Sequence, residues 1–301
     1  MKKKNLYKKF IAKIKSVCKS RRIPKSFSRK KNNVFSNAKH ITMYVLMEKE
    51  EKSYREIIEL IDLLKDEIGL QRLPHFTTIN KFALRVKPFW FNQLIEEIIK
   101  SVATEEAVLC AIDGTGLNLN SRSSYFCTIA GERKEFLQLN ACFENRLRLI
   151  TAAKIRRKRR NENIDAPLLM KKTSKQLKLD AFLMDKAYDS EKNHIVAEKC
   201  GTRMIAPLRK KTKQYHRIKG VHRKRLFKDF PREIYNKRAS ICENGFSVLK
   251  NSFGDIIYAR KFKTQKNEAL GKIVAYNLVK VIKYCYAIEL LSTAVLTQKS
   301  L

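Results

Sequence analysis

Two aspartates in this 301-residue chain each follow a short apolar run with the composition of a buried strand. Asp113 ends "AVLCAID", and Asp185 ends "DAFLMD". Carboxylates at the ends of such strands point into the cleft where α/β sheets place their ligands. Two carboxylates that come close together repel each other unless a cation lies between them. We therefore expect Asp113 and Asp185 to converge on a metal ion.

Glu243 is the candidate for a third carboxylate. It is the single acid in "YNKRASICENGFSVLK", residues 235–250, a segment that also carries several lysines and arginines. Glu243 and Lys250 lie seven residues apart, so on a helix they share one face. Three carboxylates can hold two Mg²⁺ ions ~3.5–4 Å apart for phosphoryl transfer. Taken singly, each acid could equally cap a turn or balance surface charge; the three together favour a metal site.

The composition indicates a polyanionic partner. The formal net charge is +36 and the sequence pI is about 10.0, which far exceeds what solubility requires. Nucleic acid is the expected partner through phosphate neutralisation, and an anionic membrane surface is the weaker alternative. Seven dispersed cysteines without a C-x-x-C pair indicate reduced thiols, and the five histidines lack zinc spacing. Charges interrupt the apolar C-terminal stretch, so we expect no membrane span. Together with a nucleic-acid partner, this predicts a cytoplasmic, nucleoid-associated protein.

The order of charge and periodicity predicts three regions. Residues 1–40 contain fifteen lysines or arginines and no acid, which predicts a basic, flexible arm. Residues 41–105 predict a helical DNA-binding domain, in which Ser53 and Glu56 have capping-box spacing and Gly69 ends the helix. A helix-turn-helix and generic helical packing remain equally open there. Residues 106–301 predict an α/β domain with three strands, then alternating helices and strands, and a C-terminal helix.

Two basic runs border the acids along the chain. They are "KIRRKRR", residues 154–160, and "RKKTKQYHRIKGVHRKR", residues 209–225. Such runs are as often solvated arms as nucleic-acid contacts, but their position favours a DNA track. The DNA contacts predicted in the first run are Arg156, Arg157 and Arg159. Two further acids, Asp165 and Asp189, each precede a predicted helix and are expected to be N-caps; for Asp189 the alternative is that it replaces Asp185 as a metal ligand.

The segments around the three acids resemble a known family. "AIDGTGL", "FLMDKAYDS" and "YNKRASICENGFSVLKNSFG" are similar to segments of the DDE transposases of insertion sequences, in the branch with a Tyr-Arg-Glu-Lys signature. The resemblance spans about residues 53–278 and implies an RNase H-like mixed sheet with flanking helices. It implies that the acids bind two Mg²⁺ ions, with Mn²⁺ as a substitute. The positions carried over are Asp113, Asp185 and Glu243 for metal and catalysis, and Tyr235, Arg238 and Lys250 for transposon-end phosphates.

One spacing departs from the signature. Four residues separate Arg238 from Glu243, whereas the family has three. If the helix already includes Arg238, this offset turns its side chain about 140° away from Glu243. If the helix starts at Ser240, Arg238 lies in the preceding loop and can still reach a phosphate.

These observations predict a transposase that binds double-stranded DNA as a homodimer. It would cut the ends of its element and join them to target DNA by metal-dependent phosphoryl transfer. The alternatives are an RNase H-like nuclease without strand transfer and a noncatalytic nucleic-acid-binding protein. The last of these predicts no dependence on a divalent metal.

Overall fold

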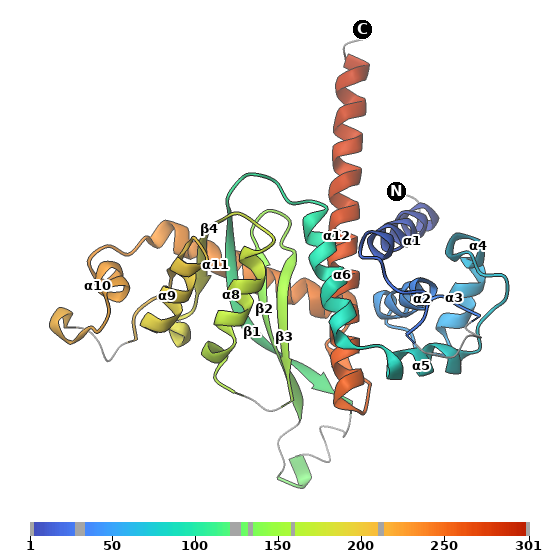
Figure 1. Cartoon of the computed structure of the whole chain (residues 1–301), viewed down its shortest axis with the longest axis horizontal. Coiled ribbons are helices and arrows are strands. Elements are labelled where there is room, and N and C mark those ends of the chain that lie inside the picture. Colours follow the sequence, from blue (N-terminus) through green and yellow to red (C-terminus); the bar gives the residue numbers. More distant parts are fainter. Residues whose placement is uncertain are drawn as a thin grey trace. The chain divides into compact units, whose positions relative to one another are not determined.

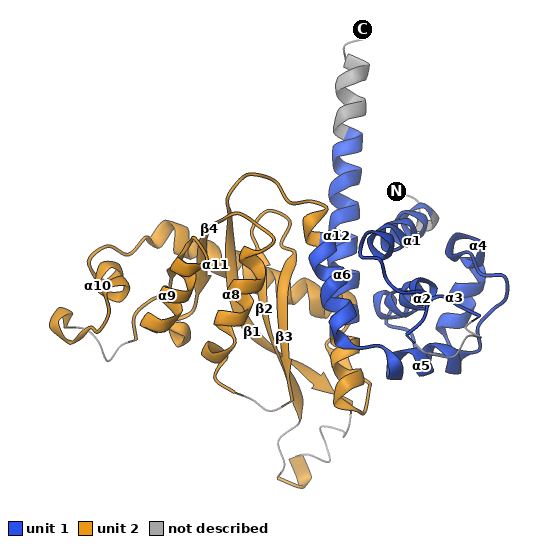
Figure 2. Cartoon of the chain, viewed as in Figure 1, with its two compact units in different colours: residues 1–98, 270–301 blue, residues 99–269 orange. Residues whose placement is uncertain are grey.

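The computed structural model describes residues 3–27, 34–120, 128–131, 135–157, 160–209 and 214–298. The chain divides into two compact units (Figure 2). Unit 1 comprises residues 1–98 and 270–301, and unit 2 comprises residues 99–269. No helix in the described part of the chain carries an apolar run long enough to cross a bilayer.

Unit 1 is helical. Its elements are α1 (Lys3–Ser20), α2 (Asn37–Lys49), α3 (Ile57–Leu63), α4 (Lys65–Ile68), α5 (Phe76–Arg85), most of α6 (Pro88–Lys100) and the later part of α12 (Phe262–Gln298). Tyr44, Phe82 and Phe91 are fully buried in its core, and the Tyr44 ring packs against both phenylalanine rings. A Cβ at Gly271 of α12 would lie 3.0 Å from the Tyr44 ring, so the glycine lets α12 approach α2 closely.

The predicted capping-box hydrogen bonds and the glycine end are present, but the helix begins only at Ile57 and is interrupted at Leu64, which divides it into α3 and α4. The backbone N–H of Ser53 donates to the Glu56 carboxylate at 2.9 Å, and the N–H of Glu56 donates to the Ser53 hydroxyl at 3.3 Å. This reciprocal pair satisfies two donors that the helix start leaves free. Gly69 ends α4 in the left-handed conformation with φ 78°, which glycine adopts without steric cost.

The predicted flexible arm over residues 1–40 differs from the structure. Residues 3–20 form α1, and one face of this helix is buried. Its apolar residues recur at helical spacing: Tyr7, Phe10, Ile11, Ile14, Val17 and Cys18. Burial of this stripe outweighs the dense positive charge on the opposite face, because charge can remain solvated while the apolar stripe packs.

Unit 2 contains a six-stranded mixed sheet (Figure 1). Its strands are β1 (Val108–Leu119), β2 (Phe136–Glu144), β3 (Ile150–Arg156), β4 (Leu179–Met184), β5 (Arg203–Ile205) and β6 (Ile256–Ile257). The order is β3-β2-β1-β4-β5, with β6 paired to the far end of β1. β1, β2 and β3 are antiparallel neighbours, and β4 and β5 run parallel to β1. The predicted mixed α/β class, with an RNase H-like sheet, is confirmed.

Helices cover both faces of this sheet. On one face, α8 (Ala166–Ser174) and α9 (Glu191–Lys199) enclose a core with Ile112, Phe182 and Met184. On the other face, α11 (Arg232–Phe253) contacts β1, β2 and β4. A short helix, α10 (Val221–Lys228), precedes α11 and contacts α9. Successive strand residues point to opposite faces, so neighbouring β1 residues face different helices.

The predicted domain boundaries also differ from the structure at the C-terminus. The sequence prediction placed residues 106–301 in one domain, whereas residues 270–301 belong to unit 1. α12 begins in unit 2, and its later residues Ile273, Tyr276 and Val281 are buried. Helical periodicity shows that such a stripe must be buried but does not show which partner buries it.

Replacement of Gly245 by alanine should destabilise unit 2. A Cβ there would lie 2.5 Å from the ring of Phe143, a fully buried β2 residue that also packs edge-on against Phe246. Overpacking costs about 1–3 kcal/mol, which exceeds the gain of up to ~1 kcal/mol from replacing a helical glycine. We expect a lower thermal midpoint for Gly245→Ala. The control Asn244→Ala, at an exposed neighbouring position, should not lower it.

Candidate active site

The register of β1 and β4 places Asp113 beside Asp185. Ile112 pairs with Met184 in the parallel ladder, and β4 ends there. Asp113 and Asp185 are the next residue on each chain, so their side chains project to the same face of the sheet. The negative charge of Asp185 contributes to the environment of Asp113. Asp113 is not at the end of β1, as the sequence suggested, because β1 continues to Leu119; it lies where the pairing with β4 stops.

A guanidinium group supplies the positive charge next to Asp113. Arg238 Nη1 donates to Asp113 Oδ2 at 3.0 Å, and the Gly114 amide donates to Asp113 Oδ1 at 2.9 Å. Both charged side chains are largely buried, with 17% and 25% of their surfaces exposed. Burial raises the pKa of Asp113, the Gly114 amide and Arg238 oppose that rise, and Asp185 adds to it. The Arg238 guanidinium therefore supplies the positive charge that favours the ionised form of Asp113 in the isolated protein.

The helical phase of α11 separates Arg238 from Glu243. α11 begins at Arg232 and so includes Arg238, which realises the 140° offset that the spacing predicted. Arg238 and the buried Cys242 face the sheet, whereas Glu243 is exposed. Burial raises the pKa of the Cys242 thiol, and the charges of Asp113 and, more weakly, Glu243 add to this rise. Among the described residues, no three acidic, histidine or cysteine side chains form a group that could hold a metal ion.

Two further signature residues also lie on α11. Burial raises the pKa of Tyr235, Arg238 opposes that rise, and the charges of Asp185 and Asp113 add to it. The Tyr235 phenol therefore lies in the field of the acidic pair. Lys250 is partly exposed and lies two helical turns beyond Glu243 on the same face. The structure thus groups Tyr235 and Arg238 with the aspartates, and groups Lys250 with Glu243.

A carboxylate that the sequence reading missed packs behind Asp113. A Cβ at Gly114 would lie 2.2 Å from Glu162 Oε1, so the glycine lets the Glu162 carboxylate approach the backbone next to Asp113. The hydroxyl of Tyr188 donates to Glu162 Oε2 at 3.1 Å. Tyr188 is fully buried, and burial followed by the charges of Glu162 and Asp113 raises its pKa. The run "DGTG" at residues 113–116 was the available signal, because glycine at 114 allows this close approach.

In the basic run at the end of β3, Arg156 is engaged by an acid of the protein, whereas the predicted DNA contacts of the run remain predictions. Arg156 donates through Nε and Nη2 to Asp165 at 2.7 and 2.5 Å, and Asn140 Nδ2 donates to the same carboxylate at 2.7 Å. Asp165 is 2% exposed, and its side chain does not cap α8. Arg156 therefore neutralises a buried acid. Arg157 is exposed, and Arg159 lies outside the described residues.

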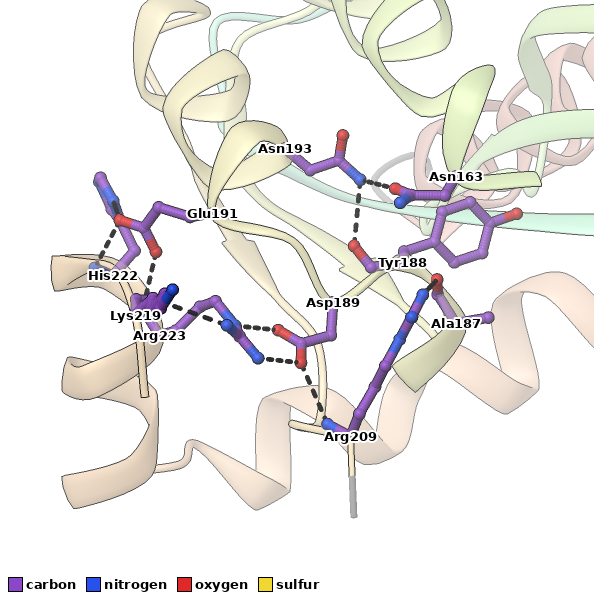
Figure 3. A network of polar contacts seen from close by, with 10 residues as sticks. All are labelled: Asn163, Ala187, Tyr188, Asp189, Glu191, Asn193, Arg209, Lys219, His222 and Arg223. Carbon is purple, nitrogen blue, oxygen red and sulfur yellow. Dashed lines mark hydrogen bonds and ion pairs between the residues drawn. The ribbon is translucent and has the colours of Figure 1, made fainter. Parts of the chain in front are cut away.

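Asp189 is likewise not the helix cap that its position suggested. α9 begins after Ser190, which makes no side-chain cap bond. The Asp189 carboxylate instead binds the guanidinium of Arg223 and the backbone N–H of Arg209 (Figure 3). The position of Asp189 just before α9 suggested a cap, whereas its observed partner Arg223 comes from a segment more than thirty residues away in the chain.

The Asp113–Arg238 pair should stabilise the metal-free protein. Arg238→Gln leaves Asp113 largely buried without its cation, which should cost about 1–3 kcal/mol of unfolding free energy. Asp113→Asn should relieve most of this loss when combined with Arg238→Gln, so a double-mutant cycle in urea should show coupling between the two positions. Lys237→Gln removes the same charge from an exposed neighbour and is the control. Additive effects of the two site variants would contradict the pairing.

The comparison with known families matches this region of the chain. A family model described as "Transposase DDE domain" matches residues 105–278, more than half of the chain. The matched range contains the sheet, both strand aspartates and α11. A search of curated proteins found no match to the chain. Because DNA is the substrate of this family, the match also implies that DNA is the partner. The chain belongs to the DDE transposase family.

Proposed function

We propose that this protein cuts the ends of a DNA insertion element and joins them to target DNA. The observation that carries the proposal is the side-by-side placement of Asp113 and Asp185 at the end of the β1–β4 pairing. Two neighbouring carboxylates oppose each other's ionisation, and a bound cation relieves that repulsion. The family match gives the reaction class within which such a site operates.

The donor set fits Mg²⁺ or Mn²⁺. Both ions prefer carboxylate oxygens, and the acid pair lies in a partly buried position that already attracts a guanidinium. We propose that Asp113 and Asp185 hold the first ion and that Glu243, exposed on α11, supplies the third carboxylate when DNA binds. Bound ions in such a site would activate the attacking oxygen and stabilise the leaving oxygen.

The residues of α11 would orient the DNA backbone. Arg238 neutralises Asp113 in the isolated protein, and a metal ion on Asp113 would free its guanidinium for a phosphate. Guanidinium groups bind phosphate with two parallel hydrogen bonds, so this exchange keeps the donors of Arg238 satisfied. Tyr235, beside Arg238, would contact the same strand, and Lys250 would add charge on the face of Glu243.

The reaction would proceed in two in-line steps without a covalent protein intermediate. Water first attacks the phosphodiester at the element's end, and the 3′-hydroxyl that is freed then attacks target DNA. The chain's own contribution is to place the scissile phosphate against the acid pair and to shield its charge. Pairing of two element ends requires at least two copies of the chain, so we propose a homodimer on DNA.

A noncatalytic DNA-binding protein is the second candidate. It is favoured by one observation: no three-carboxylate group is assembled within the ranges that the structure describes. In that case the exposed position of Glu243 would be its final position, and Asp113 would serve only to bind Arg238. Dependence of strand cleavage on a divalent metal distinguishes the two functions.

Removal of any of the three acids should abolish cleavage. We expect Asp113→Asn, Asp185→Asn and Glu243→Gln to eliminate Mg²⁺-dependent cutting of a DNA duplex that carries the element's end. DNA binding should persist or strengthen, because each change removes a negative charge near phosphate. Cleavage is measured on labelled duplex, and binding is measured by gel shift without metal.

The matched control is Asp180→Asn. Asp180 lies on the same strand, β4, but is 43% exposed and pairs with Arg203 at the surface, so its loss should leave cutting intact. Retained cleavage in the three site variants would remove the proposed site. Cleavage without joining of the freed 3′ end to target DNA would indicate a nuclease that lacks strand transfer.

A further inference from the structure

The carboxylate of Asp189 is enclosed and carries three hydrogen bonds. Its side chain has no exposed surface, whereas that of its partner Arg223 is 15% exposed. Arg223 donates through Nε at 2.7 Å and through Nη2 at 2.8 Å, and the Arg209 backbone N–H donates at 3.0 Å (Figure 3). Removing the only guanidinium partner of a buried carboxylate is strongly destabilising, because the negative charge is then left buried without compensation. The position of Asp189 is therefore set by Arg223.

Asp189 ends the loop that begins with the second site acid. We refer to residues 185–189 as the Asp185 loop. Its Ala187 carbonyl accepts a bond from Arg209 Nη2 at 2.8 Å, and its Tyr188 carbonyl accepts one from Asn193 Nδ2 at 3.0 Å. The loop is thus held at three successive residues by groups that follow it in the chain. Because only three residues separate Asp185 from Asp189, a shift of the second is expected to displace the first.

Arg223 lies on α10, the helix of the second basic run. The first turn of α10 is held by a second acid, Glu191, which accepts bonds from the His222 backbone N–H at 3.1 Å and its Nδ1 at 2.8 Å. A Cβ at Gly220, where φ is +101°, would lie 2.0 Å from the Glu191 carboxylate. Glycine is therefore required for this close docking. Arg225 and Lys228, on the same helix, remain exposed.

We propose that Asp189 and Arg223 are positioning residues that connect the docking of α10 to the placement of Asp185. DNA phosphates on the exposed cations of α10 would stabilise its docked position. The docked helix in turn holds Asp189 through Arg223 and fixes the Asp185 loop for metal binding. This inference rests on the proposed function, because it assigns the basic run a role in assembling that same site.

The test measures how much metal each variant needs. Arg223→Gln and Asp189→Asn should raise the Mg²⁺ concentration for half-maximal DNA cleavage about tenfold or more, as loss of outer contacts to metal ligands does. Arg223→Lys keeps the charge but not the paired bonds and should give an intermediate shift. Arg203→Gln breaks an exposed Arg–Asp pair in the same unit and should leave the metal requirement unchanged.

A second measurement needs no activity. In the metal-free protein, amide hydrogen exchange in the Asp185 loop should be faster in Arg223→Gln than in the wild type or Arg203→Gln. If Arg223→Gln does not fold, the double variant Asp189→Asn/Arg223→Gln removes both charges and carries the same test. Unchanged metal requirement and unchanged exchange in the folded variants would overturn the inference. Failure of the proposed function would be recognised by a different result, namely retained DNA cleavage in Asp185→Asn.

Discussion

The pairing of buried carboxylates with arginines organises unit 2. Three such pairs join different elements of the unit: Asp113–Arg238 links β1 to α11, Arg156–Asp165 links β3 to the start of α8, and Asp189–Arg223 links the Asp185 loop to α10. In each pair the acid is more buried than an unpaired charge can be without a large desolvation cost. Some of the arginines that make the chain so basic therefore stabilise the fold by neutralising buried acids.

The three pairs differ in what could replace the arginine. Asp165 also accepts a bond from Asn140, and Asp189 also accepts one from the Arg209 backbone, so both carboxylates are saturated by protein donors. Asp113 has the nearby charge of Asp185 as well, and this charge opposes its ionisation. A divalent ion would compensate both aspartates, whereas one guanidinium bonds to Asp113 alone. The proposed metal site is thus the one pair of the three in which a single guanidinium faces two carboxylate charges.

Local sequence patterns accounted for much of the fold. Alternating and continuous apolar runs located β1, β2 and β4, and the capping box and Gly69 located the α3–α4 segment. The charge count of residues 1–40 was misleading, because an apolar stripe on α1 decided its structure. The stripe was visible in the sequence at helical spacing, so composition should not have outweighed periodicity there.

The sequence by itself determined which acids could act together and that their partner carries negative charge. It also fixed the phase between Arg238 and Glu243, since a continuous helix leaves no freedom in the angle between two of its residues. Only the tertiary structure decided which arginine meets which carboxylate, and it assigned Arg156 and Arg223 to buried acids rather than to the surface. Ion pairs depend on distance in space, and the same residue types occur many times in a chain with 65 lysines and arginines.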